Sequence, residues 1–346
     1  MTRRHVITGG SGFLGQRLAG ALLARGERVT IFDLVPPRSM PVEMITGDIA
    51  SAADLARLRL GPDDVVHHLA ARQFHGIVPR RDRDGWFDAV NVAGTRALLQ
   101  AMATGGARRM LFVSTDMTYG VPTHTPVPPT HAQAPIGPYG RSKVAAERLI
   151  ATAAEEFGLR ATIFRPRLIA GAGRLGILAR LFQLIALGLP VPMIGSGRNR
   201  YQMIAVEDCV AAMIRATERD LPPGPFNLGS NDPPTVRELL RSLIARARSR
   251  SVLIPTPAAL VQRTLATLDR AGLPLLYPEQ FAIADADYVL DTSETRAALR
   301  WAPSRRDGDI LFDAYHHFRS HPPRTESAAT QRPPPRSAGA PSRGVG

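Results

Sequence analysis

Residues 8–15 read Thr8-Gly9-Gly10-Ser11-Gly12-Phe13-Leu14-Gly15 and contain the glycine spacing G-x-x-G-x-x-G. The stretch follows a short apolar run, His5–Thr8, and leads into a segment with Leu14, Leu18 and Leu22 at helical spacing. Glycines at such a junction permit a tight turn and let a pyrophosphate approach the backbone at the helix N-terminus. In this strand–turn–helix setting, the pattern predicts a dinucleotide-binding fold.

Strands alternate with helices over the first two-thirds of the chain, which is typical of a parallel sheet wrapped on both faces. We therefore predict an α/β fold with a doubly wound parallel sheet. The expected helices lie near Asp88–Met102 and over Tyr139–Phe157. The expected strands are His5–Thr8, Arg28–Asp33, Met44–Thr46, Val65–Leu69, Met110–Ser114 and Thr162–Phe164.

The composition changes after Arg165, where Gly/Pro-rich loops surround an apolar helix predicted at Ile177–Leu187. A strand over Gln202–Val206 and a helix over Val236–Arg248 are also expected. We predict a nucleotide-binding domain over residues 1–166. Residues 167–319 form mainly a smaller substrate-binding domain, with some elements returning to the sheet. Residues 320–346 are rich in Pro, Ser and Arg and are predicted to be disordered.

An acidic residue, Asp33, ends the second predicted strand. At this place a carboxylate accepts hydrogen bonds from the adenosine ribose and repels a 2′-phosphate. The sequence therefore favours NAD over NADP as the cofactor. Arg38 lies close enough in sequence to keep NADP as the alternative.

The chain has 43 lysines and arginines, and only Lys143 is a lysine. It falls four residues after Tyr139, so a helix places the two side chains on one face. A lysine ammonium responds to its surroundings in a way that guanidinium cannot. A cation beside the phenol favours phenolate and lowers a pKa that starts near ~10. The pair predicts a tyrosine that acts as a base.

These motifs, with Asp48-Ile49 and His68-Leu69-Ala70-Ala71 after the third and fourth strands, resemble the extended short-chain dehydrogenase/reductase family. The likeness is closest to its NAD-dependent nucleotide-sugar epimerases and dehydratases. It runs from about His5 to about Trp301 and is sharpest up to Pro166. The resemblance implies a seven-stranded Rossmann domain, a C-terminal substrate domain, and a catalytic Tyr-x-x-x-Lys with a Ser or Thr partner.

The resemblance also implies a set of cofactor contacts. Asp48 would meet the adenine, Ala70 and Ala71 would line the cofactor channel, and Lys143 would hold the nicotinamide ribose as well as acidify Tyr139. The full set expected to bind NAD is Gly9, Gly12, Phe13, Leu14, Gly15, Asp33, Asp48, Ile49, Leu69, Ala70, Ala71, Ser114, Tyr139, Lys143, Arg165 and Pro166.

The family places its Ser or Thr after the fifth strand, and alignment on Tyr119-Gly120 assigns that role to Thr115, with Ser114 and Thr118 as substitutes. The Thr115 hydroxyl would share a hydrogen bond with the substrate oxygen. Similar sugar dehydratases carry Thr-Asp-Glu here, whereas this chain has Thr115-Asp116-Met117. A thioether cannot take a proton, so water elimination loses its expected base. Asp116 and Met117 are expected to contact substrate.

Signals for the substrate are mixed. Arg200 precedes a predicted strand where nucleotide-sugar enzymes place a diphosphate-binding arginine, and guanidinium suits such contact. Leu168 replaces the family's usual asparagine, and Ala205 replaces a common histidine. The loop Arg72–Trp86 lies where substrate enters and is expected to set specificity, with His75 as a candidate contact. His67 and His68 are expected to pack.

Composition excludes several classes of protein. The formal charge is +13, but the arginines are scattered and no aromatics alternate with them, which argues against a nucleic-acid partner. No apolar run approaches the ~18–20 residues that span a bilayer. The single cysteine, Cys209, sits in a helical segment and is expected to pack. No residue spacing predicts a metal site. A cytoplasmic protein is expected, and the resemblance implies a homodimer.

We predict an NAD-dependent enzyme that acts on a nucleotide-activated sugar as a 4-epimerase, with Tyr139 as the base. A competing hypothesis is an apolar substrate, as in 3β-hydroxysteroid dehydrogenases or dihydroflavonol reductases. Arg200 argues against it, and the apolar stretch Val252–Leu275 argues for it. A nucleotide-sugar 4-ketoreductase or dehydratase is a third hypothesis, and a cofactor-sensing protein with no turnover is a fourth.

Overall fold

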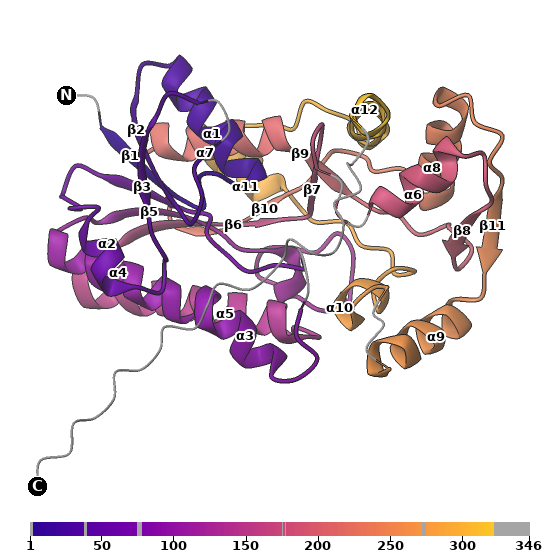
Figure 1. Cartoon of the computed structure of the whole chain (residues 1–346), viewed down its shortest axis with the longest axis horizontal. Helices are drawn as coiled ribbons and strands as arrows, with labels where there is room; N and C mark the ends of the chain where they lie inside the picture. The colour runs from indigo at the N-terminus through magenta and orange to yellow at the C-terminus, as the bar shows by residue number, and fades with distance from the viewer. Residues whose placement is uncertain are drawn as a thin grey trace, which may run out of the picture.

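The computed structural model describes residues 3–37, 40–74, 78–174, 176, 178–271 and 275–321. A large parallel sheet with helices on both faces occupies one half of the molecule, and smaller elements gather at its other end (Figure 1). Within these described residues, no helix is both long enough and apolar enough to span a membrane. The predicted disordered tail falls almost wholly outside the described residues.

The main sheet has seven strands in the order β10-β6-β5-β4-β1-β2-β3, and all of its pairings are parallel. The predicted seven-stranded Rossmann sheet is confirmed. The interior residues of β1, β2, β4 and β5 are buried because helices cover both faces of the sheet. Their bounds are β1 Arg4–Thr8, β2 Arg28–Asp33, β3 Glu43–Thr46, β4 Val65–His68, β5 Arg109–Val113, β6 Arg160–Pro166 and β10 Gly224–Leu228.

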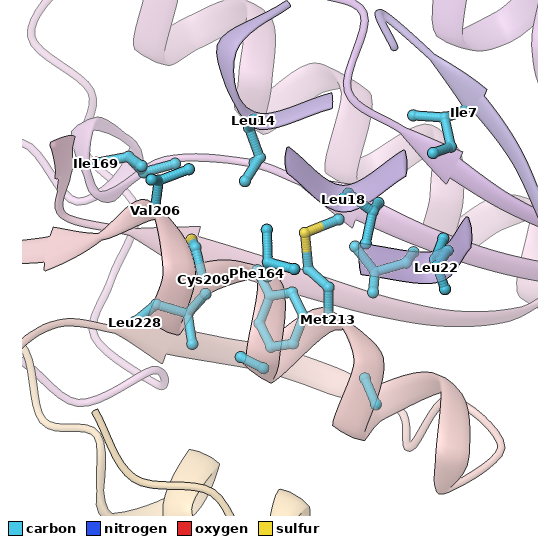
Figure 2. Close-up of a cluster of buried hydrophobic side chains, with 14 of the residues drawn as sticks. Ile7, Leu14, Leu18, Leu22, Phe164, Ile169, Val206, Cys209, Met213 and Leu228 are labelled. Carbon is cyan, nitrogen blue, oxygen red and sulfur yellow. The ribbon is translucent and has the colours of Figure 1, made fainter. Parts of the chain in front are cut away.

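Two hydrophobic cores fix the sheet between its helices. On one face, α1 (Phe13–Ala24) and α7 (Val206–Glu218) pack against the strands, and Figure 2 shows Leu18, Phe164 and Met213 meeting there. Cys209 belongs to this core and is buried, as expected. On the other face lie α2 (Ala52–Ala56), α4 (Ala93–Gly105) and α5 (Pro138–Phe157), with α3 (Arg83–Asn91) beside α5 (Figure 1).

The helix predicted near Asp88–Met102 is two helices in the structure. The break falls at Val92, whose φ of −101° and ψ of −57° end α3 and begin α4. The Asn91 side chain accepts from the Arg72 N–H and donates to the Arg72 carbonyl. These bonds tie the helix junction to the loop that follows β4. α3 begins as early as Arg83 because Asp82 caps it, accepting from the Gly85 N–H.

Most of the remaining elements build the outer part of the molecule beyond the C-terminal ends of the strands, whereas α11 packs beside β10 and α7 of the main sheet (Figure 1). β7 pairs with β9 and β8 with β11, each in parallel. Most of them share a hydrophobic cluster around Phe182 and Tyr315. The bounds are β7 Leu168–Ala170, α6 Leu178–Ala186, β8 Val191–Ile194, β9 Met203–Ala205, α8 Val236–Arg246, β11 Leu253–Thr256, α9 Ala258–Arg270, α10 Pro278–Phe281, α11 Ser293–Leu299 and α12 Asp307–Ser320.

Candidate functional site

The glycine-rich turn brings β1, α1 and the end of β4 into close contact. Gly9 has a φ of +71°, and a Cβ there would lie 2.6 Å from the Ala70 backbone nitrogen. A Cβ on Gly15 would lie 2.5 Å from the Gly9 carbonyl oxygen. Side chains are therefore excluded at both positions. The turn sits where the strand order reverses between β1 and β4, which is the ligand-binding edge of such sheets.

A cavity of about 560 Å³ opens over this turn. The cavity is large enough for an extended cofactor. Backbone N–H groups at a helix N-terminus, such as the start of α1, are suited to donate to a pyrophosphate. The residues present therefore fit a dinucleotide. Of the expected cofactor contacts, those that line it are Gly9, Gly12, Phe13, Leu14, Gly15, Asp33, Asp48, Ile49, Leu69, Ala70 and Ala71.

Asp33 lies at the end of β2 and is fixed by the backbone. One carboxylate oxygen accepts from the Ser11 N–H at 3.0 Å and the other from the Leu34 N–H at 2.7 Å. Each oxygen has a second lone pair, so both can still accept from a ribose. Arg38, on which the NADP alternative depended, lies outside the described residues.

A second cavity of about 320 Å³ adjoins the first and shares Gln73, Val113, Ile169, Arg174 and Gly176 with it. Thr115 and Tyr139 both line this second cavity, and so do Asp116, Met117, Ser114 and Pro166. The structure thus brings together residues that are more than twenty positions apart in sequence, as the motifs predicted. We refer to the first as the dinucleotide cavity and to the second as the substrate cavity.

Tyr139 is in the first turn of α5 and only 5% exposed. Phe74 contacts its ring edge-on, with 5.4 Å between ring centroids, and Phe87 lies on another side. Burial raises the pKa of the phenol, and Asp116 and Glu279 raise it further. Arg174 and a hydrogen bond with Gln73 act in the opposite direction and lower it.

Lys143 lies one turn further along α5, where its ammonium is buried. Its Nζ donates to the Val113 carbonyl at 2.7 Å and lies 4.0 Å from the centre of the Phe112 ring. Burial lowers the pKa of the ammonium to about 7, against an opposing effect of Glu147. Neither cavity is lined by Lys143. The cation that acts on the Tyr139 pKa is Arg174.

Among the three candidate hydroxyls after β5, Thr115 is the best placed. It lines the substrate cavity, donates to Asp116 Oδ1 at 3.2 Å, and accepts from the Met117 N–H. Ser114 also lines the cavity, but its hydroxyl donates to Glu147. Thr118 is fully buried, donates to the Thr115 carbonyl and does not line the cavity.

Asp116 forms a buried ion pair with Arg167 at the end of β6. The guanidinium of Arg167 lies between two rings, 4.7 Å from the centre of Tyr201 and 4.2 Å from that of Tyr288. Arg167 lines the substrate cavity and was not predicted as a site residue. The only feature of the sequence that could have pointed to Arg167 is its position two residues after Arg165.

Arg165, which was expected to contact the cofactor, has its guanidinium engaged by other side-chain and backbone groups. Its guanidinium pairs with Glu147 of α5 at 2.5 Å and donates to the Pro129 carbonyl at 2.9 Å. It lines neither cavity. Arg165 is a buried structural ion pair.

Arg200 was predicted to bind a diphosphate, and it too lies outside both cavities. Its guanidinium forms a two-bond ion pair with Asp287, at 3.0 and 2.6 Å. Asp287 was not visible as a partner because it lies 87 positions further along the chain. The arginines that line the substrate cavity are instead Arg167, Arg174 and Arg180.

The loop predicted to set specificity does supply cavity residues, namely Gln73 and Phe74. Phe74 stacks on Tyr277, with 4.8 Å between ring centroids. His75 lies outside the described residues. His67 and His68 are buried, as expected, and burial lowers the pKa of His68 to about 3. Leu168, which replaces the usual asparagine, also lines the substrate cavity.

Comparison with known proteins gives consistent matches. The model of the NAD dependent epimerase/dehydratase family matches residues 5–229. The chain is 30% identical over 327 residues to the uncharacterised protein y4nG of Sinorhizobium fredii, covering 93% of this chain and 80% of that protein. It is 29% identical over 355 residues to UDP-glucose 4-epimerase of Streptomyces lividans, covering 93% and 98%. UDP-glucose 4-epimerase of Thermotoga maritima, solved with UDP-glucose, shares the fold with a TM-score of 0.74 at 24% identity, covering 92% and 99%.

Proposed function

The chain belongs to the NAD dependent epimerase/dehydratase family, and on that premise we propose that it inverts C4 of a nucleotide-activated sugar. The family predicted from the motifs is confirmed, and with it an enzyme of extended short-chain dehydrogenase type whose cofactor is NAD. The observation that carries the proposal is the placement of Thr115 and Tyr139 in one cavity that adjoins the dinucleotide cavity.

We assign NAD to the dinucleotide cavity. The start of α1 would hold the pyrophosphate, Asp33 the adenosine ribose, and Asp48 with Ile49 the adenine. The bound cofactor supplies the hydride acceptor that makes oxidation of a sugar hydroxyl reversible. Because substrate and product differ only in configuration, no net change in cofactor redox state is required.

The chain's own residues move the proton. Tyr139 removes the proton from the C4 hydroxyl and returns one when the hydroxyl forms again on the opposite face. Thr115 shares a hydrogen bond with the same oxygen and holds it beside Tyr139. The intermediate ketone would rotate within the substrate cavity and receive the hydride on its other face.

Elimination of water is disfavoured by the same site. Met117 has no proton to exchange, and the Asp116 carboxylate is paired with Arg167 in a buried setting. Both of its oxygens are thus engaged by neighbouring side chains, Oδ1 by the Thr115 hydroxyl and Oδ2 by the Arg167 guanidinium. We therefore place epimerisation ahead of dehydration.

The test is incubation of the purified protein with UDP-, GDP- and dTDP-sugars, followed by NMR. Inversion at C4 supports the proposal, and loss of water would favour dehydration instead. Tyr139→Phe removes the phenolic oxygen and keeps the ring, so it should abolish turnover while the protein remains folded. If no sugar nucleotide is converted by the wild type, the proposal is wrong.

A second candidate is oxidation or reduction of an apolar alcohol or ketone, and the wall of the substrate cavity favours it. Apolar or aromatic side chains make up much of that wall, among them Phe74, Met117, Leu168, Leu178, Leu275, Leu276 and Tyr277. The loss of Arg200 as a diphosphate ligand removes one argument against it. Turnover of a sterol or flavonoid, with a net change of cofactor redox state, would establish this candidate.

We also propose separate roles for the two parts of the chain and a homodimeric assembly of the protein. Residues 1–166 would bind NAD and residues 167–319 mainly the substrate, while β10 and α7 return to the large sheet. The family resemblance supports a homodimer formed through the α3–α5 side of the molecule (Figure 1). Light scattering on the purified protein tests the assembly.

A further inference from the structure

β8 and β11 form a two-stranded parallel sheet at the outer margin of the molecule (Figure 1). The inner face of this sheet carries Val191, Met193 and Leu253, which pack into the hydrophobic cluster of the outer elements. The other face carries Pro192 and Ile254, which are paired in the strand register and are both exposed. Parallel strands are almost always covered on both faces, so an exposed apolar face on such a pair is unusual.

Further apolar side chains continue the exposed face where the two strands begin. Val252 is 59% exposed directly before β11, and Leu187 and Leu189 are 64% and 44% exposed shortly before β8. A Cβ on Gly188 would lie 3.7 Å from the Arg250 Cβ, so the two strand starts are adjacent. Apolar side chains grouped in this way on a folded protein mark a site of interaction. The outer apolar surface, as we call it, consists of Leu187, Leu189, Pro192, Val252 and Ile254.

A cavity of about 530 Å³ adjoins the outer apolar surface and shares Leu187 with it. It lies between the C-terminal ends of α6 and α8 and the second half of α12. No Asp or Glu is among the described residues that line it. We call it the basic cavity, because its ionisable side chains other than Tyr315 are Arg246, Arg248, Arg250, His316 and Arg319.

The positive charge of the basic cavity is largely uncompensated. Within the described part of the chain, Arg248, Arg250 and Arg319 form no ion pair, and all three are exposed. Arg246 differs, because it pairs with Asp309 at 2.9 Å. Guanidinium groups without a protein partner are suited to bind phosphate and carboxylate groups. The basic cavity therefore favours an anionic ligand.

The two features together favour a negatively charged lipid surface. Apolar side chains beside arginines are the pattern with which a protein lies on an anionic bilayer, the apolar groups at the acyl boundary and the cations at the headgroups. A second copy of the chain fits less well. In a two-fold contact the same surface meets itself, and no described carboxylate of the basic cavity would receive the arginines of the other copy. The segment 322–346 also fits less well, because its sequence holds arginines and a single glutamate.

We propose that the outer apolar surface and the basic cavity dock the protein on the surface of an anionic membrane. The contact is peripheral, since no helix among the described residues could span a bilayer. None of the described residues that form it lines the dinucleotide cavity or the substrate cavity. Docking is therefore separate from the reaction proposed above and does not depend on it.

The test is sedimentation of the full-length protein with phosphatidylcholine vesicles, prepared with and without phosphatidylserine. The wild type should bind vesicles with phosphatidylserine at least about tenfold more tightly. Val252→Thr/Ile254→Thr keeps β-branched side chains at the strand and removes apolar contact, so binding should weaken about tenfold. Arg248→Gln/Arg250→Gln removes two cations from the headgroup contact and should also weaken binding about tenfold.

Matched variants separate this contact from the general positive charge of the chain. Val121 is 54% exposed outside the outer apolar surface, so Val121→Thr should bind within about twofold of wild type. Arg28→Gln/Arg296→Gln removes the same charge from exposed positions on β2 and α11. It should also stay within about twofold of wild type at physiological salt, where distant charges are screened. Retained NAD binding, followed by fluorescence, shows that each variant is folded.

Several outcomes would overturn the proposal. They are no binding of the wild type to phosphatidylserine vesicles, equal binding to both kinds of vesicle, or equal losses in the test and control variants. Light scattering adds one more: if Val252→Thr/Ile254→Thr lowers the mass of the assembly, a second copy covers this surface and the membrane does not. Because vesicle binding needs no sugar nucleotide, failure of the epimerase assay leaves this result intact.

Discussion

At the scale of single residues, the one lysine of the chain lies in a tightly packed, buried place. The Lys143 ammonium donates to the carbonyl of Val113, a residue that lines both cavities, and lies over the Phe112 ring. A guanidinium is larger, planar and permanently charged, so it cannot share this buried place. Lysine is thus required at position 143 because the buried place is small and because an ammonium, unlike a guanidinium, can change its pKa there.

Lys143→Arg should reduce kcat by about 10²-fold or more, in the range seen for loss of acid–base machinery. The reason is that the longer arginine side chain, with its planar guanidinium, disrupts the contacts with Val113 and Phe112. Arg148→Lys, an exposed change on the same helix, is the control and should retain activity. Steady-state kinetics on both variants check this. Wild-type rates in Lys143→Arg would mean that the lysine is incidental.

Arg200→Gln should change KM for a UDP-sugar by less than about threefold, because its guanidinium is committed to Asp287 outside the cavities. The two side chains are 41% and 38% exposed, so their pair adds at most about 1 kcal/mol to the free energy of unfolding. Asp287→Asn is the companion variant. A large rise in KM confined to Arg200→Gln would restore the diphosphate role.

At the scale of elements, the helix that carries Tyr139 is capped from a distant part of the chain. Glu279 of α10 accepts from the Tyr139 N–H, and its second oxygen is buried without a hydrogen-bond partner among the described residues. Burial raises its pKa to about 7 from an ordinary 4.5. The short helix of the substrate side therefore helps to set the start of α5.

This carboxyl gives stability a defined pH dependence. A raised folded pKa means that the native state binds the proton more tightly, so its contribution is complete below about pH 4.5 and is lost as pH rises through 7. Glu279→Gln keeps the acceptor and removes the titration. Urea denaturation should show that wild type loses stability relative to Glu279→Gln between pH 5 and 8. Parallel curves would contradict this.

At the scale of the whole molecule, sequence predicted the sheet well and the outer contacts poorly. The positions of β1 to β6 could be predicted from apolar runs and the glycine-rich turn. Each of these is a local sequence pattern that is buried in only one way. The ion-pair partners of Arg165 and Arg200, namely Glu147 and Asp287, could not be predicted because only tertiary packing brings them close. No local pattern records such pairs.

The same limit explains the residues that the motifs missed. Arg174 lies in a Gly-rich loop with no periodicity, and its importance comes from Gln73 and Phe13, which reach it from other elements. Arg167 is marked only by the rings of Tyr201 and Tyr288 that enclose it. The sequence placed Thr115 and Tyr139 near each other, as the shared cavity shows, but it did not reveal the arginines around them.

The central claim is that this molecule inverts C4 of a nucleotide sugar with Tyr139 as the base. The most direct measurement is proton NMR of the purified protein with UDP-galactose, with reduced cofactor followed by its absorbance. The account predicts that UDP-glucose forms without net cofactor reduction and that Tyr139→Phe forms none. Unchanged UDP-galactose, together with stoichiometric cofactor reduction by an apolar alcohol, would contradict it.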